Sequence, residues 1–173
     1  MSKTFQGLYR PKHPEKYVNP RGLNNICFRS SWEKSLMIFL DRNEHIVKWG
    51  SEEIAIPYIL ETDGKMHRYF VDFYIEFDTG KKVLVEVKPF SQTQKPTNNS
   101  KKRKKTILNE TFTYIKNVCK WKAAKQFAEK NGMDFQIWTE NELQKIGINL
   151  ITSKKFRYVN SKKANQKTCS IKS

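Results

Sequence analysis

The clearest alternation of hydrophobic and polar positions lies in the middle of the chain, where two segments predict the strands of a β-hairpin. Residues 68–77 and 82–88 are rich in aromatic and β-branched side chains, which favour strands. Residues 78–80 between them end in Gly80, and glycine can take the left-handed position of a type I turn followed by a bulge. This turn places Phe77 opposite Lys81 and thereby fixes the pairing of the two strands.

The predicted pairing gives the hairpin one apolar face and one face that carries charges. The apolar pairs are Ile75 with Val83, Phe73 with Val85, and Val71 with Val87. The pairs on the other face are Glu76 with Lys82, Tyr74 with Leu84, and Asp72 with Glu86. A shift of one residue would mix the two faces, which favours this register.

Two acids and a lysine share the charged face. Asp72 faces Glu86, and Lys88 follows one pleat further along. Opposed side chains have Cβ atoms about 4.5–5.5 Å apart, and like charges there are destabilising, so we expect a cation between the carboxylates. The alternative is a solvated face without a function. Because such acid clusters are more frequent at functional sites, we favour a metal site.

A third acid, Glu33, lies in a segment with helical spacing of apolar residues, 28–41. It belongs to the core-facing stripe of that helix, from which its carboxylate could reach the acids of the hairpin. Ser30, three residues earlier, gives a second interpretation, because serine followed by glutamate at this spacing is a capping box. The two interpretations do not exclude each other.

The remaining pattern predicts a mixed sheet flanked by helices. Further strands are expected at 47–49, 54–60 and 135–138, and helices at 106–130 and 140–146. The apolar stripe of the long helix comprises Leu108, Phe112, Ile115, Cys119, Ala123 and Phe127. The strand at 83–87, this helix and the strand at 135–138 form a β-α-β unit attached to the hairpin. The fold class is therefore α/β, in the sense of an α+β mixed sheet.

Length and composition indicate one folded domain. The 173 residues are 38% hydrophobic and 13% aromatic, which is enough for a core and excludes global disorder. We expect an extended N-terminal arm over 1–25, the domain over 26–150 and a basic, mobile tail over 151–173. No apolar run could span a bilayer and no signal-peptide pattern is seen, so we expect a cytoplasmic setting. Three widely spaced cysteines support neither a zinc site nor a disulfide framework.

Positive charge is the second global signal. Lysine and arginine number 33 against 17 acids, for a net charge of +16, which suits a polyanionic partner. A membrane surface is the alternative, but no strongly apolar amphipathic face accompanies the charge. We expect contacts with DNA phosphates. The candidate residues are Arg29, Lys101, Lys102, Arg103, Lys104, Lys105, Lys116, Lys120 and Lys122.

The acids and the lysine also resemble a known family. Asp72, then Glu86-Val87-Lys88 on the next strand, with Glu33 on the preceding helix, is similar to the core of the PD-(D/E)xK nucleases, in particular the TnsA-like endonuclease branch. One departure is Val71, where the motif has proline. Over residues 8–147 the chain further resembles the head completion proteins of T-even-type tailed phages, through segments 9–12, 29–33, 51–53, 56–58, 68–73, 86–89 and 120–124.

This resemblance implies a restriction-endonuclease-like core with a catalytic set of Glu33, Asp72, Glu86 and Lys88. Asp72, Glu86, the backbone carbonyl of Val87 and, as a further candidate, Glu33 would be metal ligands. Such hard oxygen donors suit Mg²⁺, with Mn²⁺ as an alternative. Lys88 would orient or help deprotonate the attacking water and stabilise charge on the phosphate.

The implied function is that of a metal-dependent DNA endonuclease in phage head completion or DNA packaging. Its partners would be double-stranded DNA and phage head or portal proteins, with no membrane. It would act in the cytoplasm of the infected bacterial host or in the virion head. Two alternatives are a structural head completion factor that binds DNA or the portal without cleavage, and a transposition or repair endonuclease of the same superfamily.

Overall fold

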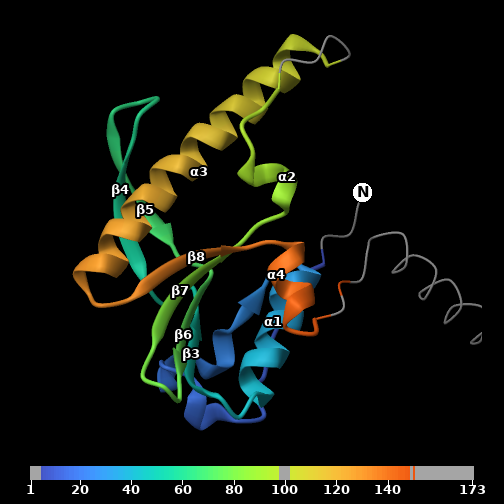
Figure 1. The fold of residues 1–173 in the computed structure, drawn as a ribbon, viewed down its shortest axis with the longest axis vertical. Coiled ribbons are helices and arrows are strands. Elements are labelled where there is room, and N and C mark those ends of the chain that lie inside the picture. The colour runs from blue at the N-terminus through green and yellow to red at the C-terminus, as the bar shows by residue number, and fades with distance from the viewer. Residues whose placement is uncertain (1–4, 98–101, 149, 151–173) are drawn as a thin grey trace, which may run out of the picture.

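The computed structural model describes residues 5–97, 102–148 and 150, and Figure 1 shows the arrangement of its elements. The predicted tail over 151–173 and Lys101 lie outside the described residues. The elements in chain order are β1 (Gly7–Leu8), η1 (Pro14–Lys16), η2 (Pro20–Asn25), β2 (Cys27–Phe28), α1 (Ser31–Arg42), β3 (Ile46–Ser51), β4 (Ala55–Leu60), β5 (Lys65–Phe70), β6 (Phe73–Phe77), β7 (Lys82–Val87), α2 (Phe90–Thr93), α3 (Lys104–Lys130), β8 (Asp134–Trp138) and α4 (Glu140–Lys145).

A four-stranded sheet in the order β3-β6-β7-β8 forms the centre of the fold. β6 is antiparallel to both β3 and β7, whereas β8 pairs with β7 in parallel. α3 connects these two parallel strands, which need a crossover connection because each must start at the same end of the sheet. The predicted mixed sheet flanked by helices is confirmed, and it agrees with a restriction-endonuclease-like core.

The β6–β7 hairpin has the predicted register. The residues that face each other are Phe73 and Val85, Tyr74 and Leu84, Ile75 and Val83, and Glu76 and Lys82. At the turn, the Phe77 N–H donates to the Lys81 carbonyl at 2.9 Å. Gly80 has a φ of 80°, the left-handed conformation that glycine adopts without steric cost. The turn at Gly80 therefore determines which residues of β6 and β7 face each other.

The segment predicted as one strand over 68–77 is divided between two sheets. Its first part is β5, which pairs with β4, and its second part is β6. Between them, the Val71 N–H donates to the Ile54 carbonyl at 3.1 Å. The prediction that Val71 pairs with Val87 is therefore wrong, since Val71 packs in a different core cluster from Val87. Because of this break, Asp72 is not among the paired residues of β6 and β7.

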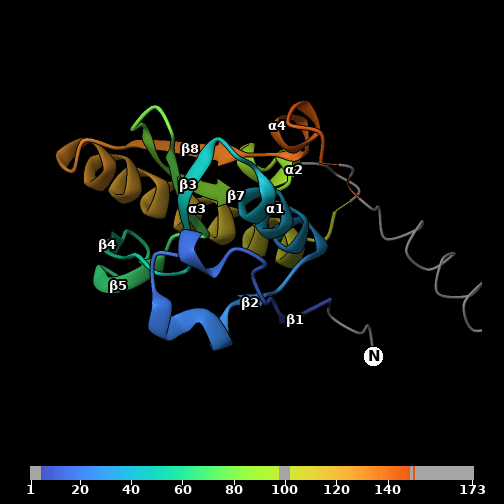
Figure 2. The same cartoon turned by 90° about the horizontal axis from the view of Figure 1, so that it is seen from below.

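Two hydrophobic cores make contact with the central sheet. One joins the sheet residues Phe73 and Val85 to Leu36 of α1 and Leu143 of α4. The other joins Leu84 to α3 and to the β4–β5 hairpin. Figures 1 and 2 show α3 running alongside β8 and this hairpin. Asp72 and Glu86 therefore lie near the place where the central sheet, the hairpin and α3 meet, whereas Glu33 lies on α1.

The segment predicted as an N-terminal arm is held against the first core. The Tyr9 hydroxyl donates to Asp41 at 2.8 Å, and the buried Asp41 also accepts from the backbone of Lys12 and His13. Tyr17 packs edge-on against Trp49, with ring centroids 4.9 Å apart. Tyr9 and Tyr17 thus serve as the anchors of this segment.

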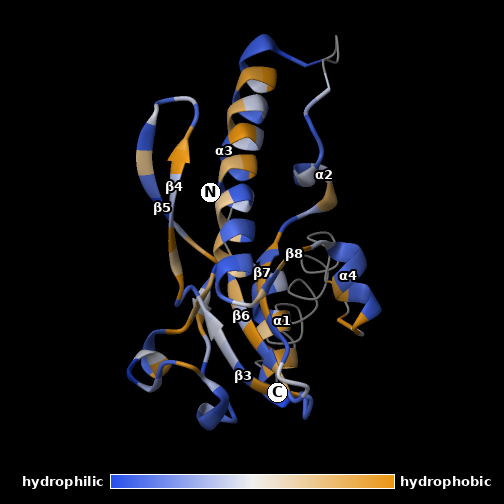
Figure 3. Ribbon diagram, turned by 60° about the vertical axis from the view of Figure 1, so that its left-hand side comes forward, coloured by the Kyte–Doolittle hydropathy of each residue, from blue (hydrophilic) through white to orange (hydrophobic). Residues whose placement is uncertain are grey.

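α3 extends well beyond the sheet at its N-terminal end. Its 27 residues span roughly 40 Å at the standard helical rise. Cys119 is buried, but Leu108 and Phe112 of the predicted apolar stripe are 55% and 48% exposed, and Figure 3 shows that apolar positions continue along this outlying half. Within the part of the chain that the structure describes, no helix is long and apolar enough to span a membrane.

Candidate active site

Asp72 occupies the break between β5 and β6, next to the end of β7. Its Oδ2 accepts a hydrogen bond from the Val87 N–H at 2.8 Å, so the carboxylate is turned towards the strand that carries Glu86. Its backbone carbonyl accepts from the Glu52 N–H at 3.2 Å. Glu52 has a φ of 55°, a conformation that non-glycine residues adopt at a cost. Strained backbone at Glu52 therefore helps to hold Asp72 outside the ladder.

Glu86 is the most deeply buried acid of the site, with 1% of its surface exposed. Its Oε1 forms an ion pair with the Lys88 Nζ at 3.0 Å. Its Oε2 accepts a hydrogen bond from the Tyr69 hydroxyl at 2.5 Å. Both oxygens are thus partnered, which offsets the cost of burying the charge. The structure brings Asp72, Glu86 and Lys88 together as the sequence predicts.

The charges of this cluster are strongly coupled. Burial and the neighbouring Glu86 carboxylate raise the pKa of Asp72 to about 8, while Lys88 and the Val87 N–H act against this increase. Burial alone would lower the pKa of Lys88, but Glu86 and Asp72 outweigh it and raise that pKa overall. A further cation beside Asp72 would stabilise its ionised form.

The donor set fits magnesium. In the described residues, no group of three or more His, Cys, Asp and Glu side chains forms a ready cluster of metal ligands. Magnesium does not need one, because it keeps several of its waters and is commonly held by one or two carboxylates. Asp72 and Glu86 supply these hard oxygen donors, and Val87 lies between Glu86 and Lys88 at the end of β7. The metal itself, and the Val87 carbonyl as its ligand, remain predictions.

Glu33 caps α1, as one of its two interpretations predicts. Ser30 is the N-cap and accepts from the Glu33 N–H at 3.1 Å. In return, the Glu33 carboxylate accepts from the Ser30 hydroxyl at 2.9 Å and from the Arg29 N–H at 2.7 Å. The carboxylate is still near enough to the site to raise the pKa of Asp72. Its role as a catalytic acid stays a prediction.

Replacing Glu33 with glutamine separates these two roles. Glutamine has one side-chain acceptor oxygen instead of two, so we expect it to keep one of the two capping hydrogen bonds and to lose about 1 kcal/mol of stability. If Glu33 acts in catalysis, cleavage falls far more than this loss explains. Thermal unfolding and single-turnover cleavage measure the two effects, with Ser30→Ala as the control that damages the cap but keeps the charge of Glu33. Cleavage equal to that of Ser30→Ala would assign Glu33 to the cap only.

Two further residues of the site were not predicted for it from the sequence. Tyr69, on β5, contacts Glu86 through its hydroxyl. Lys120, on α3, has its Nζ 5.1 Å from the centre of the Tyr69 ring; the sequence placed it among DNA-binding residues only. Burial lowers the pKa of Lys120, and the positive charges of Lys88 and Lys116 lower it further, against the opposing effect of Glu86 and Asp72.

The other basic residues predicted to bind DNA lie on several elements, and two of them are paired with acids. Arg29 forms an ion pair with Glu52, the residue that binds the Asp72 backbone. Lys116 and Lys122 are exposed on α3. Arg103 is the N-cap of α3, and Lys104 and Lys105 form the start of its first turn, so they belong to the helix and not to the loop in which the sequence placed them. Lys102 is bound to Glu110 at 2.7 Å.

Neutralising the basic residues 101–105 should weaken binding to all DNA duplexes alike, whatever their base sequence. Each lost phosphate contact reduces the slope of log affinity against log salt concentration by about 0.9. Because Glu110 already pairs with Lys102, we expect Arg103→Gln to reduce the slope more than Lys102→Gln. Binding titrations at several salt concentrations measure this slope. Lys130→Gln, at the far end of α3, is the control, and an equal effect in all three variants would contradict a localised contact.

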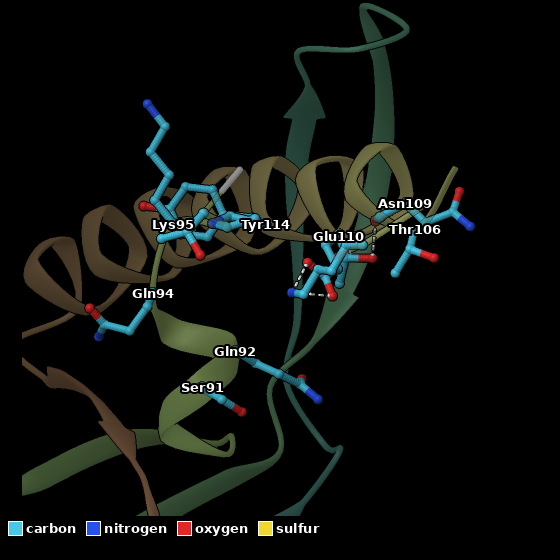
Figure 4. A pocket seen from close by; sticks show the side chains of 12 residues that line it. Ser91, Gln92, Gln94, Lys95, Thr106, Asn109, Glu110 and Tyr114 are labelled. Atoms are coloured by element: carbon cyan, nitrogen blue, oxygen red, sulfur yellow. Dashed lines mark hydrogen bonds and ion pairs between the residues drawn. The ribbon is translucent and has the colours of Figure 1, made fainter. Parts of the chain in front are cut away.

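A cavity of about 620 Å³ lies between the α2 region and the N-terminal half of α3. Figure 4 shows Gln92 and Gln94 on one side of it, and Asn109 and Tyr114 of α3 on the other. Charged side chains, among them Lys95, Lys102 and Glu110, line it together with these amide and hydroxyl groups. The first residues that line the cavity follow the active-site residue Lys88 closely in the chain, because α2 starts two residues after Lys88.

The fold and these residues define a nuclease-type core, and comparisons with known proteins agree. A model of the family described as "TnsA-like endonuclease N terminal" matches residues 43–140, more than half of the chain. The chain therefore belongs to the TnsA-like endonuclease family. It is also similar to the head completion nuclease of Enterobacteria phage T4, with 40% identity over 148 residues that cover 83% of this chain and 97% of that protein.

Proposed function

We propose that this protein is a magnesium-dependent endonuclease that hydrolyses phosphodiester bonds in double-stranded DNA. The observation that carries the proposal is the meeting of Asp72, Glu86 and Lys88 at one end of β7, with Lys88 3.0 Å from Glu86 and Asp72 bound to the Val87 N–H. Membership of an endonuclease family supports it. The net charge of +16 supports a polyanionic substrate.

Each side chain has a distinct task in this proposal. Asp72 and Glu86 hold Mg²⁺ by their carboxylate oxygens. When bound, such an ion polarises the phosphodiester and lowers the pKa of a coordinated water. Lys88 lies beside Glu86 and is partly accessible, so its ammonium orients the attacking water and stabilises the charge that develops on phosphate. Lys116 and Lys122, exposed on α3, bind the neighbouring phosphates of the backbone.

The biological setting that we propose is the completion of phage heads after DNA packaging. The relative from phage T4 is named a head completion nuclease, and almost all of its length matches this chain. The proposed partners are therefore phage head or portal proteins, and the place of action is the cytoplasm of the infected host or the virion. A protein that trims DNA in this setting needs no base-specific contacts, which agrees with phosphate binding by lysines.

A cleavage assay with purified protein tests the proposed activity. Supercoiled duplex DNA should be nicked or linearised with Mg²⁺, and should remain intact with EDTA. Ca²⁺ serves as a second control, because it occupies oxygen sites but differs from Mg²⁺ in size and geometry. A homogeneous preparation that binds duplex DNA but never cuts it in Mg²⁺ or Mn²⁺ would refute the endonuclease and leave a DNA-binding head completion factor.

A further inference from the structure

Lys120 differs from the other lysines of α3 in its surroundings. It is partly buried, whereas Lys116 and Lys122 are exposed. Its Nζ lies over the ring of Tyr69 at 5.1 Å from the centroid. Tyr69 in turn is 2% exposed and bonded to Glu86. Lys120 is thus connected, through one aromatic ring, to Glu86 near the end of β7.

The charge of Lys120 has no carboxylate partner within the described part of the chain. Lys88 is paired with Glu86, and Lys102 is paired with Glu110, but Lys120 takes part in no ion pair there. Glu86 and Asp72 attract this ammonium from a distance, but burial outweighs them and lowers the pKa of Lys120, and an aromatic face recovers only part of the cost of burial. A phosphate in direct contact with Lys120 would stabilise its charge further.

We propose that Lys120 is a second catalytic lysine, which contacts the phosphate at the point of cleavage, and that Tyr69 is the residue that positions it beside Glu86. The inference rests on the proposed function and deepens it. Lys88 and Lys120 approach the acids from different segments, Lys88 from directly after β7 and Lys120 from α3. Two cations on different sides of a phosphate can both stabilise the charge that develops on its oxygens.

Tyr69 links this lysine to the acids through two separate features. Its ring supports the ammonium of Lys120, and its hydroxyl holds Glu86. Tyr69→Phe keeps the ring and removes the hydroxyl, whereas Tyr69→Leu removes both. Lys120→Met keeps the apolar stem of the lysine and removes its charge, which preserves packing on the ring. These three substitutions allow the role of the Tyr69 ring and the role of its hydroxyl to be tested separately.

The first experiment measures single-turnover cleavage at saturating protein. We expect Lys120→Met to lower the rate by about 100-fold, the size of effect seen when one donor to a developing charge is removed. Lys120→Arg should recover part of it, because arginine keeps the charge and also stacks on aromatic rings. Lys125→Met, five residues further along α3 in an exposed position, is the matched control and should cut at the wild-type rate. Cleavage by Lys120→Met at the wild-type rate would overturn the proposal.

The second experiment tests the role of Tyr69 with a double-mutant cycle. If the ring positions Lys120, Lys120→Met should be strongly deleterious in the Tyr69→Phe background and nearly silent in the Tyr69→Leu background, because Lys120 is no longer held there. Equal losses in both backgrounds would show that Tyr69 supports only the fold. Thermal unfolding of every variant identifies any that fail to fold.

A third measurement does not depend on cleavage. Duplex binding without divalent metal, at several salt concentrations, should show a slope reduced by about 0.9 in Lys120→Met, as expected for one phosphate contact. An unchanged slope would overturn the contact even in a protein that never cuts DNA. A wild-type protein without cleavage would refute the proposed function, and with it the catalytic role of Lys120, while a reduced slope would then leave it a binding residue.

Discussion

Asp72→Asn is expected to abolish magnesium-dependent cleavage and to leave the protein folded and more stable. The substitution keeps the size of the side chain and an oxygen that accepts from the Val87 N–H, but removes the charge that a metal needs. We expect a loss of roughly 10³-fold or more, the upper range for removing a single stabilising group from a transition state. Single-turnover assays at saturating Mg²⁺ measure it. Glu76→Gln, on β6 and outside the site, is the control that should remain active.

Stability as a function of pH provides a second readout of the same substitution. The pKa of Asp72 is raised from 3.8 to about 8, so ionising it costs more in the folded than in the unfolded state. In metal-free wild-type protein this cost grows from about pH 4 to about pH 8. The advantage of Asp72→Asn should therefore be larger at pH 8 than at pH 5, and each 1 kcal/mol gained should raise Tm by about 2–4 °C. A pH-independent difference would contradict the buried acid pair.

Lys88→Met should abolish cleavage while DNA affinity barely changes. In the proposed mechanism Lys88 provides one positive charge at the reacting phosphate, whereas binding is shared among many lysines, so its share of the binding energy is small. Its removal also leaves Glu86 buried without its ion-pair partner, which is expected to cost stability. Binding titrations beside single-turnover cleavage at saturating protein separate the two effects.

Lys82→Met is the matched control for Lys88, because it lies at the other end of β7 in an exposed position. It should leave both the cleavage rate and the stability close to those of the wild type. If Lys88→Met cut at the wild-type rate once DNA is saturated, its catalytic role would be wrong. A rate lost only in proportion to affinity would instead make Lys88 a binding residue.

The local parts of the fold could be predicted from the sequence because they depend on neighbours in the chain. Gly80 fixes the turn of the β6–β7 hairpin, and that turn sets the pairing of Phe73 with Val85. The capping box of Thr139 and Glu142 likewise starts α4 at Glu140, where the sequence predicts the helix to begin. In each case a turn or a cap within a few residues determines the local structure. The prediction that Asp72 lies near Glu86 follows from such a turn, and the structure agrees with it.

The parts that could not be predicted depend on distant segments. Residues 68–77 have an unbroken strand pattern, and nothing in it marks the point at which the chain leaves one sheet for another. The hydrogen bonds of Val71 and Asp72 to Ile54 and Glu52 cause this change. It also brings Tyr69 to Glu86, although simple alternation would place Tyr69 on the same face as Val71 and Phe73. Lys120 was recognised as a basic residue, but its neighbour Tyr69 is known only from the folded chain.

The predicted strand over 68–77 is divided between two sheets. As a result, the β4–β5 hairpin can vary in length, whereas β7, the strand that carries Glu86, cannot. Residues 61–64 connect β4 to β5 at exposed positions, where doubling the length of a loop costs only about 0.6 kcal/mol. One extra residue within β7 ahead of Glu86 would instead turn Glu86 to the opposite face of the sheet. New binding modules can therefore be inserted at this tip, by evolution or by design, while the catalytic spacing is inherited unchanged.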